Sequence, residues 1–131
     1  MKVKSYTDLE QSKKLAEILP IESANMHYSK DYDGSWFVDL AEYTSVKIPK
    51  YVDNIEEHLL PCWSLAALLG VLPEIQGGKP IIALDDNYIT YPHMSDLHTK
   101  ADNIIDACYN MIIRLNELSL ELALKAKKGN N

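Results

Sequence analysis

Residues 101–122 read ADNIIDACYNMIIRLNELSLEL, and this stretch decides the fold. Its apolar residues recur at alternating spacings of three and four, which is typical of one continuous helix face over three heptads. The residues on this seam are Ala101, Ile104, Cys108, Met111, Leu115, Leu118 and Leu122. With Ser95 or Thr99 as the N-cap, the pattern predicts a long helix that runs to about Lys127. A disordered tail is expected at about 128–131.

Four further residues of this stretch lie off the seam: Tyr109, Ile113, Leu120 and Leu124. A helix that docks on a sheet by one face should carry polar residues at such positions. Either the helix is buried on two sides within its own chain, or the second face packs on another chain. Because symmetric dimers are the commonest assemblies, we predict a homodimer with these four residues at its interface.

Before this helix, the sequence predicts two hairpins and two shorter helices. The first hairpin joins 21–28 to 35–40 through turn-forming residues that end in Gly34, and the second joins 81–84 to 88–91. The first helix covers 8–19, with Thr7 as its N-cap and Pro20 as its stop. The second covers 61–72 and carries almost no polar residue, so we expect it to be buried.

These elements give the order αββαββα, with 41–60 as a long surface connection. The sequence therefore predicts an α+β fold with three helices and one antiparallel sheet of about four strands, ending in the long C-terminal helix. A length of 131 residues suits a single domain over 1–131.

Composition limits the classes of partner. The chain has 13 Lys and Arg against 19 Asp and Glu, a net charge of −6, so a nucleic-acid partner is not expected. No apolar run is long enough for a membrane span, and the N-terminus lacks the apolar core of a secretory signal. Cys62 and Cys108 form no Cys-x-x-Cys pair and sit among apolar residues, so we predict two small core side chains in a protein of the reducing cytoplasm. The sequence leaves a disulfide between them open.

One polar cluster is a candidate for chemistry: His93, Asp96, His98 and Asp102. On the predicted helix, His98 and Asp102 share a face, and the four side chains offer nitrogen and oxygen ligands to a divalent metal. The alternative is that these residues cap the helix or lie on the surface. No P-loop, nucleophile elbow or dinucleotide fingerprint is present in the sequence, and we expect no cofactor.

Aromatic residues are the other candidates for contacts. We assign Trp36 and Trp63 to the core, and leave Tyr32, Tyr43 and Tyr51 as candidate contact residues.

Three segments carry a resemblance: SANMHY at 23–28, PCWSLAALL at 61–69 followed by Leu72-Pro73, and DACYNMIIRL at 106–115. Together they resemble a family of short uncharacterised proteins of gut bacteria and of their prophages and mobile elements. The resemblance covers most of the chain. It implies an intracellular, phage-related accessory protein and supplies no catalytic residue.

The sequence thus predicts a non-enzymatic binding protein that self-associates through its C-terminal helix and contacts a protein partner of unknown identity. One alternative is a small metal-assisted hydrolase built on the His93, Asp96, His98 and Asp102 cluster. Another is an acidic inhibitor that mimics nucleic acid and occupies a basic groove on a host protein.

Overall fold

The structure is a computed structural model, and it describes residues 4–42, 58–92 and 94–118. Along these ranges the elements are α1 (Leu9–Ile18), η1 (Ile21–Ser23), β1 (Met26–Lys30), β2 (Trp36–Asp39), β3 (Leu59–Cys62), α2 (Leu65–Val71), β4 (Ile81–Ala83), η4 (Leu84–Asp86), β5 (Tyr88–Tyr91), β6 (Met94–Lys100) and α3 (Ile104–Glu117).

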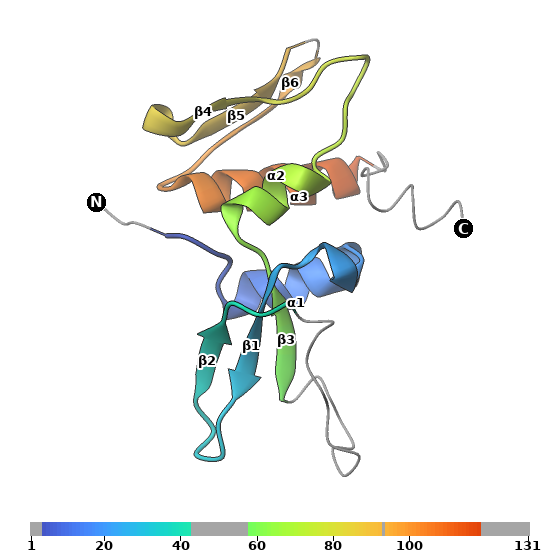
Figure 1. The fold of residues 1–131 in the computed structure, drawn as a ribbon. Coiled ribbons are helices and arrows are strands. Elements are labelled where there is room, and N and C mark those ends of the chain that lie inside the picture. Colours follow the sequence, from blue (N-terminus) through green and yellow to red (C-terminus); the bar gives the residue numbers. More distant parts are fainter. Residues whose placement is uncertain (1–3, 43–57, 93, 119–131) are drawn as a thin grey trace.

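The predicted α+β class and the three helices are confirmed, but the single four-stranded sheet is wrong. The described residues form two antiparallel sheets of three strands each, in the orders β2-β1-β3 and β4-β5-β6. We call them the first and the second sheet. The three helices lie between the two sheets, with α2 and α3 beneath the second sheet and α1 next to the first (Figure 1).

The two strands that the sequence pattern missed are β3 and β6. Leu59 and Leu60 belong to the predicted surface connection but are buried in β3, and Pro61 and Cys62 come from the start of the predicted second helix. Met94–Lys100 overlaps the start of the predicted last helix. Each becomes the third strand beside a predicted hairpin, pairing with β1 or β5. The pairing overrides local helix signals because strand formation depends mainly on cross-strand packing.

Side-chain caps fix where the helices begin. The α1 N-cap is Asp8 rather than Thr7, and Asp8 forms a reciprocal capping box with Gln11. Ser64 caps α2, so that helix starts after Pro61 and not at it. Asn103 caps α3 by accepting the N–H of Asp106. The predicted end of the last helix near Lys127 lies outside the described residues.

Two predicted turn residues adopt the expected left-handed conformation. Gly34 has φ +90° in the β1–β2 turn. Asn87 has φ +51° directly before β5, where an asparagine tolerates that region. The turn at Gly34 is therefore confirmed, whereas Ile21–Ser23 of the predicted first strand and Leu84 of the predicted strand 81–84 lie in 3-10 helices.

The main core surrounds α3, which is buried from two sides. Its side chains at Ile105, Cys108, Met111, Ile112 and Leu115 are fully buried. They belong to one cluster with residues of α1, α2, β5 and β6. A smaller core lies on one face of the first sheet and is made of Met26, Tyr28, Leu60 and Cys62. No helix in the described ranges is long and apolar enough to cross a membrane.

Candidate interaction surface

The outer edge of β2 carries backbone groups that no other described residue pairs with. The Asp31 N–H donates to the Ser35 carbonyl oxygen at 2.7 Å, so the backbone groups of Ser35 point toward β1. Those of Phe37, two residues further along the strand, point the same way. Because antiparallel strands alternate their hydrogen-bonding direction, the N–H and C=O of Trp36 and Val38 point away from β1. Figure 1 shows β2 at the margin of the first sheet, on the hairpin that extends away from the helices.

The opposite edge of the same sheet is interrupted by a proline. Lys30 N–H donates to the His58 carbonyl oxygen at 2.9 Å, so alternation turns the Pro61 position away from β1. A proline has no N–H to offer to an added strand, and natural proteins use it to blunt sheet edges. β2 contains neither proline nor lysine, so among the described residues the first sheet is protected at β3 and open at β2.

Large apolar side chains accompany the open edge. Phe37 is 49% exposed, Leu40 is 79% exposed, and Tyr32 in the turn is fully exposed. We call these three side chains, with the outward backbone groups of Trp36 and Val38, the hairpin edge. Exposed aromatic residues are enriched in binding surfaces. The prediction that Tyr32 is a contact residue fits this placement, whereas Tyr43 and Tyr51 lie outside the described residues.

The hairpin that carries this edge is acidic. Residues 26–42 contain four carboxylates, at Asp31, Asp33, Asp39 and Glu42, and one lysine. That lysine, Lys30, places its Nζ 5.6 Å from the centre of the Trp36 ring. Hydrogen bonds from the side chain and backbone of Ser35 lower the pKa of Asp33, which keeps its carboxylate charged.

A buried histidine holds the chain that leaves β2. His27 Nδ1 lies 2.7 Å from the Ala41 carbonyl oxygen, and the ring is almost fully buried. Since a carbonyl can only accept, Nδ1 carries the proton. This bond ties Ala41 to the sheet, so the neighbouring Leu40 stays beside the edge although β2 ends at Asp39.

The predicted metal cluster does not assemble among the described residues. Asp96 and His98 lie on β6, not on a helix, so His98 and Asp102 do not share a helix face as predicted. Both β6 residues face solvent, and the His98 ring packs 6.0 Å from the ring of Tyr88. Asp96, His98 and Asp102 do not converge as metal ligands would, and His93 lies outside the described ranges.

The described part of α3 contains two of the four predicted interface residues, Tyr109 and Ile113. Tyr109 is half-buried and packs against the main core of its own chain. Burial, together with the charge of Asp8, raises the pKa of Tyr109. Ile113 is also half-buried, and Leu118 at the helix end is exposed. Leu120 and Leu124 lie outside the described residues, so the interface stays a prediction.

Both cysteines are free and fully buried, as predicted from their apolar neighbours. Burial raises the pKa of the Cys108 thiol to about 12. Burial also raises the pKa of Cys62, although hydrogen bonds from Thr7, Ser12 and Tyr28 act in the opposite direction. Cys62 lies in β3, not at a helix N-terminus. Neither thiol has the exposed, electropositive surroundings of a nucleophile.

We therefore expect the native protein to resist thiol reagents. At pH 8, Cys108 should react with Ellman's reagent about a thousandfold more slowly than glutathione, because almost none of it is ionised and it is inaccessible. Two thiols per chain should titrate rapidly in denaturant. Rapid reaction of either thiol under native conditions would contradict the burial described above.

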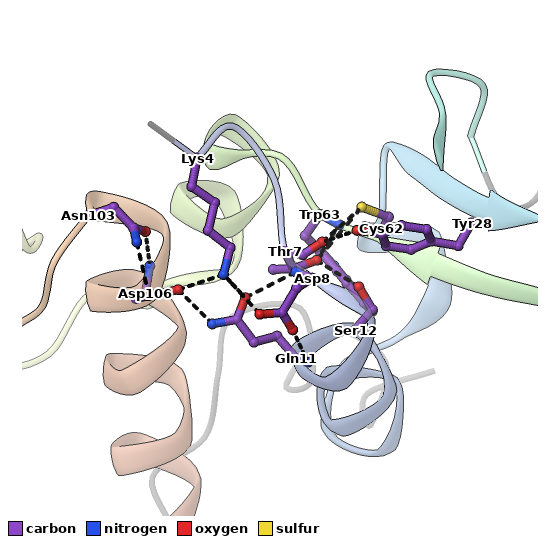
Figure 2. A network of polar contacts seen from close by, with 10 residues as sticks. All are labelled: Lys4, Thr7, Asp8, Gln11, Ser12, Tyr28, Cys62, Trp63, Asn103 and Asp106. Atoms are coloured by element: carbon purple, nitrogen blue, oxygen red, sulfur yellow. Dashed lines mark hydrogen bonds and ion pairs between the residues drawn. The ribbon is translucent and has the colours of Figure 1, made fainter. Parts of the chain in front are cut away.

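A polar network joins the beginnings of α1 and α3 (Figure 2). Lys4 Nζ donates to Asp8 at 3.0 Å, to Gln11 at 2.9 Å and to Asp106 at 2.8 Å. Partial burial pushes the pKa of Asp106 upward, but hydrogen bonds from Lys4, Gln11 and Asn103 outweigh it and leave the pKa below its ordinary value. Through these contacts Lys4 links the start of α1 to the start of α3.

Replacing Asp106 by asparagine should lower the free energy of unfolding by about 1 kcal/mol near neutral pH. A lowered folded-state pKa means that the carboxylate stabilises the fold above the unfolded value of 3.8, and that this contribution is lost as the pH falls through the folded value. Urea unfolding of Asp106→Asn and the wild type should therefore converge below about pH 4. The exposed Asp96→Asn is the control, and an unchanged gap in acid would refute the assignment.

A shallow cavity of about 430 Å³ lies between α1 and β3. It is lined by Lys13, Ala16, Glu17, Ile21, Leu59, Leu60 and Pro61. Its floor is apolar, and its two charged residues are exposed on α1. No described residue presents a nucleophile or a buried acid to it.

The hairpin edge was not predicted, because alternation shows which residues share a face of a strand and not which strand lies at the margin of the sheet. The pattern grouped Trp36, Val38 and Leu40 on one side, and only the first two pack on the smaller core. A usable signal was the absence of lysine and proline from residues 36–39.

A comparison of the chain with protein-family models, with curated proteins and with solved structures finds no match in any of the three.

Proposed function

We propose that the protein is a non-enzymatic binding protein that captures an extended segment of another protein as an added strand on β2. The observation that carries this proposal is the open edge: outward N–H and C=O groups at Trp36 and Val38, beside exposed Phe37 and Leu40. In strand addition, main-chain hydrogen bonds supply affinity and alternate side chains supply specificity.

Unbiased peptide selection followed by hydrogen exchange tests this proposal. Peptides selected from a random library on the immobilised protein should slow amide exchange at Trp36 and Val38 at least tenfold, since these N–H groups gain acceptors. The Phe37 amide is the internal control, because it already faces β1 and should change much less. If every selected peptide protects residues elsewhere, such as the outer face of the second sheet, the proposal is wrong.

Self-association through α3 is a second candidate, which the exposed Leu118 and the half-buried Ile113 favour. Light scattering at micromolar concentration should then give twice the chain mass of 14.8 kDa. Ile113→Glu should yield a folded monomer, whereas Asn110→Glu, at an exposed position on the same helix, should remain dimeric. A wild-type monomer would contradict this candidate.

We further propose that the protein acts in the cytoplasm, because two free buried thiols suit a reducing compartment. The resemblance to short proteins of gut bacteria and their prophages makes a phage-related accessory role our proposed setting. In such a role, binding an extended segment would need no catalytic residue.

A further inference from the structure

We infer that the segment captured by β2 is basic: a strand in which Lys or Arg residues flank an apolar residue, in the pattern basic-x-apolar-x-basic. This inference rests on the proposed function and names the chemistry of its partner. It follows from the placement of the side chains around Phe37 and from the charge of the hairpin.

The geometry sets which partner residues lie together. Residues that bond to the outward groups of Trp36 and Val38 place their side chains on the side of the smaller core. The partner residue between them faces Phe37 on the other side of the sheet. The partner residues two positions before and two positions after this central one lie on the same face as Phe37. One of them lies next to Asp39, and the other lies next to the β1–β2 turn. An apolar residue suits Phe37, and each end of β2 presents a carboxylate.

The charge then selects basic residues for those flanking positions. Residues 30–39 carry three carboxylates and one lysine, a formal charge of 1 − 3 = −2. Lys30 keeps its positive charge beside the Trp36 ring and is already counted in this sum. Asp31 and Asp33 lie at the turn end and Asp39 at the other end of β2, and all three are exposed. Opposite charges across neighbouring strands stabilise pairing, and like charges oppose it.

The same charges argue against a second copy as the occupant. Antiparallel pairing of two β2 strands would bring the turn of one hairpin, with Asp31 and Asp33, to the Asp39 end of the other. Like charges would then meet twice across a symmetric interface between chains of net charge −6. The same carboxylates that would repel a second copy would attract the lysines and arginines of a basic segment from a different protein.

Three labelled peptides of matched length test the inference by fluorescence anisotropy. The basic peptide is acetyl-Thr-Lys-Val-Phe-Val-Lys-Thr-amide, the acidic one replaces both lysines by glutamate, and the third N-methylates both valines of the basic peptide. The basic peptide should bind at least tenfold more tightly than either of the others. Its affinity should also fall about tenfold between low and high salt.

Charge reversal on the protein supplies a matched comparison. Asp39→Lys should weaken the basic peptide and strengthen the acidic one, each by at least threefold. Asp96→Lys makes the same charge change at an exposed position on β6 and should alter neither affinity. Circular dichroism verifies that both variants are folded.

The possible failures separate the two proposals. If neutral or acidic peptides protect Trp36 and Val38 as well as basic ones do, the basic partner is wrong and strand addition stands. If the N-methylated peptide binds as tightly as its parent, strand addition itself is wrong. A wild-type dimer in which the Trp36 and Val38 amides are protected without any peptide would show a second copy on β2 and would overturn the inference.

Discussion

Replacing Trp63 by alanine should lower the free energy of unfolding by about 3–5 kcal/mol, the usual range for removing a buried aromatic side chain. Trp63 is fully buried in the main core, between the residues of β3 and the start of α2. Its indole Nε1–H donates to the Ser23 hydroxyl at 2.9 Å, so the substitution also leaves that hydroxyl with one partner fewer.

Chemical denaturation followed by circular dichroism measures the loss, and Trp36→Ala is the matched control. Trp36 is half-buried on an edge strand, so the same truncation there should cost no more than about 2 kcal/mol. Since the proposed binding edge includes the Trp36 backbone, this control also separates folding from binding. Equal losses at the two positions would contradict the separation of main core and hairpin edge.

Thr7→Val should destabilise the protein by about 2–4 kcal/mol, although valine has nearly the same shape and is more apolar. The Thr7 hydroxyl lies 2.8 Å from the Ser12 hydroxyl and accepts the Trp63 N–H at 3.2 Å (Figure 2). All of these groups are buried, and valine would leave a donor and a hydroxyl without partners. Unsatisfied buried polar groups carry the full cost of desolvation.

Thr99→Val is the control for this second experiment. The Thr99 hydroxyl makes one hydrogen bond, to the Ala107 carbonyl oxygen at 2.7 Å, and is half-buried. We expect a loss of about 1 kcal/mol there by the same denaturation measurement. If Thr7→Val were as mild as Thr99→Val, the hydroxyl of Thr7 would not join β3 to α1 as described.

The sequence predicted the elements whose signals are local. The first and last helices have periodic apolar faces, the second is almost entirely apolar, and Gly34 adopts the backbone expected of a turn residue. The burial of both cysteines also followed from their apolar neighbours. Each of these features depends on residues that lie close together in the sequence.

The features that the sequence missed depend on residues far apart in the chain. Leu59–Cys62 becomes a strand because it pairs with β1, more than 30 positions earlier, and that pairing overrides the helix-start signal of Pro61. Met94–Lys100 becomes a strand against β5, which removed the helix on which the predicted metal cluster relied. The candidate binding edge was missed for the same reason, because an edge exists only once the order β2-β1-β3 is known.

Pro61 has a consequence for how many molecules can join. A sheet that accepts strands at both margins can stack copy upon copy into an endless fibre. With one margin interrupted by a residue that lacks an N–H, growth by this chain stops after a single addition. The proposed strand addition on β2 would therefore give finite complexes of one-to-one stoichiometry, because the β3 edge cannot extend the sheet.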